Sequence, residues 1–441
     1  MSDLALRGGQ KAVTINYSEV GARAVVSEAE IEAAVELMRK GQISSSPLVQ
    51  DFEAKFAEYI GTKYALASTS GTCAINEALF AVGVGPGDEV LVPSYTFWAS
   101  AAPIIAAHGV PVFCDVDPDT YCIDPVDIKR RLTPRTKAIM VVHVWGNPAN
   151  MDAILEIARE NGIAVIEDAS RAHGSEWNGK KIGSLGDVAC FSLQGSKVMA
   201  AGEGGVLTTN NREYYERAIA LGHYERLSGL PKDSKYRKYS LTGLGFKHRT
   251  HPIGIAIASK QLDELEERNY IRDTNGKYLE EGLKDIDCIK IQKVLPKGKR
   301  IYSYHYTIYD ETKLQGVSLI TFLSALKAEG VICGKCGYGR LHEAPLFTEG
   351  VPYGKGCPGK CSHVEAPMVD KVPSLPVTEY LRDNTFMLAP RFEEPCEDLI
   401  DQYIEAYHKV VANIDELKEY ENENKDAKVS TTETGRSINL I

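Results

Sequence analysis

The middle of the chain alternates short apolar runs with segments of helical periodicity. Between about residues 63 and 210, five runs have the length and composition of buried strands: YALAS, DEVLVPS, PVFCDV, AIMVVHVWG and IAVIEDA. Helical patterns separate them, among them SGTCAINEALFAVGV, TFWASAAPIIAAHG and MDAILEIARENG. Near-continuous apolar strands that alternate with helices predict an α/β fold with a mostly parallel sheet covered on both faces. Ligands of such sheets bind at the carboxyl ends of the strands.

The whole chain is predicted to be divided into four parts. Residues 1–45 are expected to be a lead-in with one helix, because Ser27 is followed three positions later by Glu30 and the segment ends at Gly41. We expect a large domain over residues 46–285 and a smaller C-terminal α/β domain over 286–412, with the strand KRIYSYHYTIYD and the helices SLITFLSALKAEG and DLIDQYIEAYHKVVANI. The charged and polar residues 413–441 predict a disordered tail.

Composition narrows the class of protein. The 441 residues include 50 basic and 60 acidic side chains, and the net charge of -10 argues against a nucleic acid or an anionic membrane as partner. No apolar run approaches the roughly 20 residues of a membrane span, and the first residues lack the apolar segment of a secretion signal. The ten cysteines are scattered and several lie in apolar runs, which favours reduced thiols. These features predict a cytoplasmic protein.

Two charged residues that lie in apolar segments are candidate active-site residues. Asp168 ends the strand IAVIEDA, where a buried carboxylate needs a partner such as the pyridinium nitrogen of pyridoxal phosphate (PLP). A capping role at a strand–loop junction is the alternative. Lys197 follows Gly195 and Ser196 and precedes apolar residues and a glycine-rich turn. A partly desolvated lysine has a lowered pKa and forms Schiff bases, although it can also lie along an apolar surface with its amine in water.

Two further segments complete a possible cofactor site. In STSGTCA, a glycine turn opens a helix, so the Ser70, Gly71 and Thr72 region suits a phosphate, with an ordinary helix cap as the alternative. Ser192 adds a hydroxyl to the same phosphate. In PSYTFWAS, Phe97, or else Trp98, is placed to stack on a pyridine ring, although aromatic residues are more often part of a core. Their order along the chain, together with the aspartate and the lysine, is the one that a PLP enzyme needs.

These stretches resemble the sugar aminotransferase family of fold-type-I PLP enzymes, often called the DegT–StrS family. The similarity extends from about residue 27 to 412 and includes SGTCAINEAL, GPGDEVLVPSYTFWAS, IEDASRAHGS and FSLQGSKVMAAGEGG. The resemblance implies that Lys197 forms the Schiff base and that Asp168 contacts the pyridinium nitrogen. The other implied cofactor contacts are phosphate contacts at Gly71, Thr72 and Ser192, ring stacking by Phe97, and His173 near the cofactor.

The resemblance also implies a homodimer with the active site at the subunit interface, where the partner subunit contributes the stretch GFKHRTHP (245–252). Many family members have Gln in place of Arg171 and Asn in place of Lys247, which lies near the phosphate, so this chain adds positive charge at both positions. The segment SLQGSK is similar to the corresponding segment of the glutamine-dependent cyclitol (inosose) aminotransferases. The implied reaction transfers an amino group from L-glutamine or L-glutamate to a keto-cyclitol or keto-sugar. The alternatives are a nucleotide-sugar aminotransferase for surface polysaccharide and a PLP-binding relative that does not transaminate.

A metal-centred alternative rests on the cysteines near the C-terminus. The pairs Cys333–Cys336 (CGKC) and Cys357–Cys361 (CPGKC), with His363 two residues further on, have a spacing similar to that of a zinc ribbon. The second pair is CxxxC rather than CxxC, and the family pattern has no such metal. The prediction is therefore a site without metal ligands.

Overall fold

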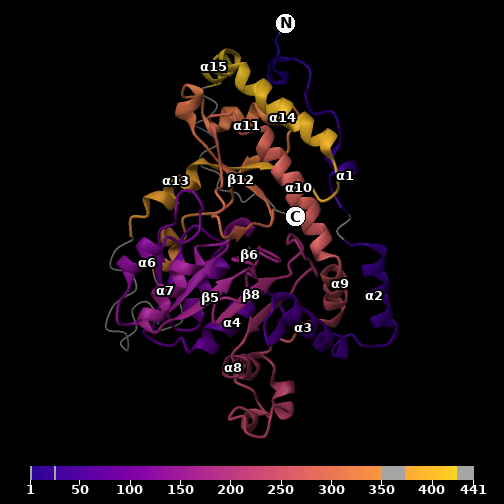
Figure 1. Ribbon diagram of the computed structural model, residues 1–441, viewed down its shortest axis with the longest axis vertical. Helices are drawn as coiled ribbons and strands as arrows, with labels where there is room; N and C mark the ends of the chain where they lie inside the picture. Colours follow the sequence, from indigo (N-terminus) through magenta and orange to yellow (C-terminus); the bar gives the residue numbers. More distant parts are fainter. Residues whose placement is uncertain (1, 24–25, 350–372, 425–441) are drawn as a thin grey trace.

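The computed structural model describes residues 2–23, 26–349 and 373–424. A seven-stranded sheet lies at the centre of its larger part (Figure 1). β9 is antiparallel to both of its neighbours in this sheet, whereas the strands from β8 to β3 are parallel, so the predicted mostly parallel sheet is confirmed. In spatial order the strands are β1 (Tyr64–Ser68), β9 (Gly205–Thr209), β8 (Val188–Ser192), β5 (Ala164–Asp168), β4 (Thr136–Val142), β2 (Glu89–Pro93) and β3 (Val110–Cys114).

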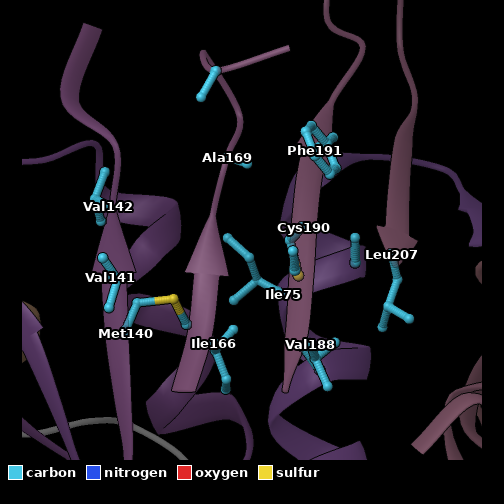
Figure 2. Packing of buried hydrophobic residues seen from close by; sticks show 14 of the residues in the cluster. Ile75, Met140, Val141, Val142, Ile166, Ala169, Val188, Cys190, Phe191 and Leu207 are labelled. Atoms are coloured by element: carbon cyan, nitrogen blue, oxygen red, sulfur yellow. The ribbon is translucent and has the colours of Figure 1, made fainter. Parts of the chain in front are cut away.

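Helices cover this sheet because each presents an apolar side to it. α4 (Gly71–Val82) packs against β5, β8 and β9, and α7 (Met151–Asn161) packs against β5. α3 (Pro47–Ile60) and α8 (Arg212–Gly222) contact β1. Figure 2 shows Ile75 of α4 between Ile166 of β5 and Cys190 of β8, and all three side chains are fully buried. This packing fixes the N-terminus of α4 beside the carboxyl ends of β5 and β8.

A second core lies on a smaller sheet, with β12 (His305–Tyr309) and β14 (Thr385–Ala389) at its centre and β10 (Ile289–Ile291) and β13 (Gly334–Lys335) at its edges. Helices α11 (Leu319–Ala328) and α14 (Glu397–Ala412) pack in this core. The long helix α10 (Leu265–Gly282) connects the two parts (Figure 1). The predicted boundary between residues 285 and 286 stays a prediction, although each sheet carries its own hydrophobic core.

The N-terminal segment confirms one prediction and adds an observation. Helix α2 (Glu28–Arg39) begins at a capping box, in which the Ser27 side chain and Glu30 satisfy each other's backbone amides. α2 packs on α9 (Pro252–Asp263). Leu4 and Val13, however, are buried in the second core, so the first residues of the lead-in are part of the smaller unit.

Three predicted elements differ from the structure. The helix expected over 96–109 is reduced to a short 3-10 turn and α5 (Ala102–Ala106), because Pro103 lacks an amide and His108 has a left-handed φ of 63°. The strand expected over 299–310 is interrupted by a turn in which the Ser303 amide donates to the Ile301 carbonyl (2.8 Å). The prediction of a disordered tail is wrong for residues 414–423, which form α15 with Leu417 buried. Residues 425–441 lie outside the described residues.

The remaining elements are short, and none of the helices within the described ranges is both long and apolar enough to cross a membrane. They are α1 (Tyr17–Val20), α6 (Pro125–Arg131), α12 (Pro345–Thr348), α13 (Pro376–Asn384), the strands β6 (Glu176–Trp177), β7 (Lys180–Lys181) and β11 (Gly298–Lys299), and the 3-10 turns at Ala5–Arg7, Trp98–Ser100, Val144–Gly146, Tyr224–Gly229, Arg237–Tyr239, Glu311–Leu314 and Leu341–Glu343.

Candidate active site

A buried carboxylate ends the central strand β5. Asp168 is 6% exposed, and its two oxygens accept hydrogen bonds from the Ser100 hydroxyl (2.6 Å) and the Ser170 amide (3.1 Å). Ser100 is held in turn by the Thr96 hydroxyl at 2.9 Å. Each carboxylate oxygen has further acceptor capacity, so Asp168 can still bind a protonated nitrogen. Ser100 was not predicted, because its only signal in the sequence is its position one helical turn after Thr96.

A half-buried lysine faces this carboxylate. Lys197 follows β8 in a turn in which its own amide donates to the Gln194 carbonyl (2.8 Å). Burial and, to a smaller extent, the Arg171 charge together lower the pKa of the Lys197 amine from 10.5 to about 7, whereas Asp168 opposes the change. Near neutral pH, a substantial fraction of this amine is therefore an uncharged nucleophile.

The N-terminus of α4 is shaped for close approach. Ser70 caps the helix by accepting from the Cys73 amide (3.1 Å), which leaves the amides of Gly71 and Thr72 at the open end. A Cβ on Gly71 would lie 2.8 Å from Cβ of Ser192. Ser192 ends β8 and is 8% exposed, so the structure brings together the three residues predicted to bind a phosphate.

The glycine-rich turn after Lys197 uses its glycines in different ways. Gly202 has a left-handed φ of 80°, as residues without a side chain allow. Gly205 instead opens β9 directly against the α4 turn, and a Cβ there would lie 2.3 Å from the Ser70 carbonyl oxygen and 2.6 Å from the Gly71 nitrogen. Glycine is required at 205 because the chain passes so close to the helix N-terminus.

His173 lies in the same region without a strong partner. The residue is fully buried, and neither ring nitrogen has a hydrogen-bond partner within 3.5 Å in the part of the chain that the structure describes. Its ring lies 5.2 Å from the ring of Phe191. Burial lowers the pKa of His173 to about 3, and the charges of Lys197 and Arg272 act in the same direction. His173 is therefore a neutral, buried ring.

Two aromatic residues and a loop remain exposed beside these groups. Phe97 and Trp98 are 51% and 49% exposed, and their rings lie 5.1 Å apart. Lys247 is exposed on the stretch 245–252. The next residue, His248, is buried and fixes the loop, because its carbonyl accepts from the Thr69 amide (2.8 Å) and its ring contacts the buried Glu77 of α4 (3.0 Å). Lys247 is thus anchored next to the turn that opens α4.

Arginines and aromatic rings form the other wall of the site. The Arg171 guanidinium lies 4.5 Å from the ring centre of Tyr304 and 5.5 Å from that of Trp145. Trp145 follows β4 with a left-handed φ of 57°, where the sequence predicted continued strand, and its ring stacks on Tyr338 at 4.3 Å. Arg391 donates to the carbonyl of Ser196 (3.0 Å), the residue before Lys197. Trp145, Tyr304, Tyr338 and Arg391 were not predicted, since they come from segments far apart in the sequence.

The cysteine pair that can be located is not arranged for a metal. Cys333 is buried in the second core, whereas Cys336 belongs to the first core and accepts a hydrogen bond from the Tyr95 hydroxyl (3.5 Å). Burial raises the pKa of both thiols. The two thiols therefore belong to different cores and have separate hydrogen-bond partners, and Cys357, Cys361 and His363 lie outside the described residues.

The residues present fit PLP. A phosphate fits the uncapped amides at α4 beside Ser192, a pyridinium nitrogen fits the free acceptor positions of buried Asp168, and an aldehyde fits the Lys197 amine. An α/β fold with a lysine and a buried aspartate at the carboxyl edge of its sheet defines the class of PLP-dependent enzymes.

Comparison with known proteins identifies the family. The model of the DegT/DnrJ/EryC1/StrS aminotransferase family matches residues 25–386. An L-glutamine:2-deoxy-scyllo-inosose aminotransferase of Streptomyces kanamyceticus is 33% identical over 312 residues, which are 67% of this chain and 70% of that protein. A GDP-perosamine synthase of Caulobacter vibrioides is 42% identical over 245 residues, 55% of this chain and 64% of that protein.

Solved structures agree with this result. The X-ray structure of the aminotransferase from Psychrobacter cryohalolentis has a TM-score of 0.77 and 26% identity, and the match covers 88% of this chain and 98% of that one. The chain belongs to the DegT/DnrJ/EryC1/StrS aminotransferase family. This membership confirms the predicted family, fold type, aminotransferase class and PLP cofactor.

Proposed function

We propose that the protein transfers an amino group from L-glutamine or L-glutamate to a keto-cyclitol or keto-sugar in the biosynthesis of aminocyclitols or amino sugars. The observation that carries this proposal is the Lys197 amine, whose pKa is lowered to about 7 beside buried Asp168 at the carboxyl edge of the sheet. The relative from Streptomyces kanamyceticus, named for L-glutamine and a deoxyinosose, supports the cyclitol substrate.

The side chains around Lys197 hold the cofactor in this proposal. When bound, PLP supplies a ring that accepts electrons from the substrate carbon. Asp168, fixed by Ser100, keeps the ring nitrogen protonated, and Phe97 stacks on the ring. The amides of Gly71 and Thr72, the Ser192 hydroxyl and the Lys247 amine bind the phosphate, and His173 lies beside the ring.

Lys197 moves the proton that transamination requires. Because its pKa is lowered to about 7, the amine can take a proton from the substrate carbon and return it, as an acid–base group near the working pH does. Burial of the surrounding groups keeps bulk water from competing for this proton. The chain therefore contributes a lysine amine whose pKa is close to the working pH and whose position is fixed.

We further propose a cytoplasmic homodimer with the active site at the subunit interface. Phe97 and Trp98, at the site, are about half exposed in the single chain, and Phe246 and Lys247 are exposed on a loop that His248 anchors. A second copy that covers these aromatic residues would complete the site. The buried, unpaired thiols among the described residues support a reducing compartment.

A second acceptor class is favoured by one comparison. The 42% identity to a GDP-perosamine synthase supports a nucleotide-linked keto-sugar as acceptor, as in surface polysaccharide synthesis. A PLP-binding protein that does not transaminate would hold the cofactor through the same Lys197 amine but would not be converted by an amino donor.

Absorbance of the purified protein tests the proposal. The wild type is expected to show the visible band of bound PLP and to lose it when L-glutamine or L-glutamate is added, and the donor that bleaches the band is the amino donor. Lys197→Ala is expected to abolish turnover. Addition of a keto-cyclitol or a nucleotide-linked keto-sugar to the bleached enzyme should then restore the band with the true acceptor class. A band that neither donor changes would refute transamination.

A further inference from the structure

Buried arginines of this protein are paired with carboxylates. Arg268 pairs with Glu30 (2.8 Å), Arg272 with Glu393 (2.8 Å) and Arg300 with Glu280 (3.1 Å). Arg171 differs, because within the described ranges no carboxylate oxygen lies within 4.0 Å of its guanidinium. The half-buried Arg217 also has no acidic partner, but its guanidinium donates to the Phe80 carbonyl at 2.7 and 3.1 Å, whereas Arg171 has a longer hydrogen bond of 3.4 Å.

The neighbours that Arg171 does have are neutral. Its guanidinium donates a long hydrogen bond to the Ser303 hydroxyl (3.4 Å) and lies against the rings of Tyr304 and Trp145. Tyr338 is the other polar group beside it. The rings hold the plane of the guanidinium by cation–π contact, while most of its N–H groups remain available. A planar fork of donors fits a carboxylate, which it binds through two parallel hydrogen bonds.

Arg171 also lies beside the reacting lysine. Among the neighbouring charges, that of Arg171 has the largest effect on the pKa of Lys197. Arg391, the other cation at this position, is already engaged by Glu393 (3.0 Å) and by the Ser196 carbonyl (3.0 Å). Arg171 is therefore the cation beside Lys197 that has donors to offer a substrate.

We propose that Arg171 binds the α-carboxylate of the amino donor. This inference rests on the proposed function, because an amino acid donor carries a carboxylate on the same carbon as the amine that must reach the Lys197 position. A keto-cyclitol carries hydroxyls instead, and a nucleotide-linked keto-sugar carries its charge on phosphates outside the reacting ring, so the donor is the substrate that places an anion next to the reacting carbon. Arg171 then selects donors that are α-amino acids over simple amines, and it orients the carbon from which Lys197 takes the proton.

Binding of an unreactive carboxylate tests the inference without turnover. Calorimetry would compare 4-carbamoylbutanoate, which is glutamine without its amino group, with the neutral diamide glutaramide on the PLP-loaded enzyme. The wild type is expected to bind the carboxylate about 10- to 100-fold more tightly than the diamide, the range of one charge-assisted bidentate contact. In Arg171→Gln this preference should disappear, and in Arg171→Lys it should be intermediate. Arg159→Gln, at an exposed arginine of α7, is the matched control and should keep the wild-type preference.

A second measurement separates this inference from the proposed function. Bleaching of the PLP band by L-glutamine should need about 10- to 100-fold more donor in Arg171→Gln than in the wild type. Equal preference for carboxylate and diamide in the wild type, or an unchanged preference in Arg171→Gln, would overturn the assignment. If only the acceptor step weakened, the anion would belong to the acceptor and the assignment would be wrong. A wild type that binds the carboxylate but is bleached by neither donor would refute the proposed function alone.

Discussion

Replacing Lys197 by Met is expected to stabilise the cofactor-free protein, although it removes the residue that the proposed reaction requires. Burial and the Arg171 charge lower the pKa of the Lys197 amine from 10.5 to about 7. Each tenfold change in an acid constant corresponds to about 1.4 kcal/mol, so holding a protonated Lys197 in the folded site costs up to about 5 kcal/mol. Methionine has a similar length and no charge, and it avoids this cost.

The sign of the pH dependence follows from the lowered pKa. Below about pH 7, the amine is charged in both the folded and the unfolded chain, and the folded protein carries the full cost. Between about pH 7 and 10.5 the unfolded chain binds a proton that the folded chain lacks, so the wild type gains stability as the pH rises. The advantage of Lys197→Met should therefore fall by about 3 kcal/mol between about pH 6.5 and 9.5.

Urea unfolding of the two cofactor-free proteins, at equal concentration and at both pH values, measures this difference. Lys63→Met serves as a control, because Lys63 is exposed and its replacement should change the free energy of unfolding equally at both pH values. If Lys197→Met does not raise the free energy of unfolding, or raises it equally at both pH values, then the folded protein does not disfavour the charged form of the Lys197 amine.

Two further predictions concern groups that position the cofactor. Ser100→Ala removes the 2.6 Å hydrogen bond to Asp168 and should slow bleaching of the PLP band by the donor about 10-fold, while PLP stays bound. Single-turnover absorbance measures this rate, and an unchanged rate would contradict the positioning role of Ser100. Gly205→Ala brings a Cβ to 2.3 Å from the Ser70 carbonyl oxygen and should weaken PLP binding at least about 10-fold in an equilibrium titration. Gly229→Ala is the control, because a Cβ there meets no atom within 4 Å and PLP binding should stay unchanged.

Much of the framework could be predicted because its signals are local. The strand-and-helix alternation between residues 63 and 210 marks the sheet, since each buried strand is a short apolar run and the helices α4, α6 and α7 each begin at a side-chain cap. Asp168 and Lys197 stand out as charges inside apolar segments. The helix expected over 96–109 failed at Pro103 and His108, where backbone restrictions outweigh apolar periodicity.

The missed residues share a physical reason. Arg391, Tyr304 and Tyr338 reach the site from segments more than 100 residues beyond Lys197, and none of them lies in a distinctive local pattern. Helix α15 was missed because its sequence is mostly charged, and it depends on contacts with α11 and on the single buried Leu417. Such contacts depend on tertiary packing, which the periodicity of one segment does not encode.

The charges around Lys197 explain why this site suits anionic ligands. Elsewhere in the described structure, several buried acids are paired with a base, as Glu53 is with Arg226 and Glu329 with Lys409. Beside Lys197, the positive charges of Arg171 and Arg391 are opposed by Asp168 and Glu203, and Glu393 is shared by Arg391 and Arg272. Arg171 has no carboxylate oxygen within 4.0 Å among the described residues, so a substrate carboxylate can pair with it, and a phosphate fits the open end of α4. Burial of the amine lowers the pKa of Lys197 most, and the charge of Arg171 acts in the same direction, so the site favours the neutral amine.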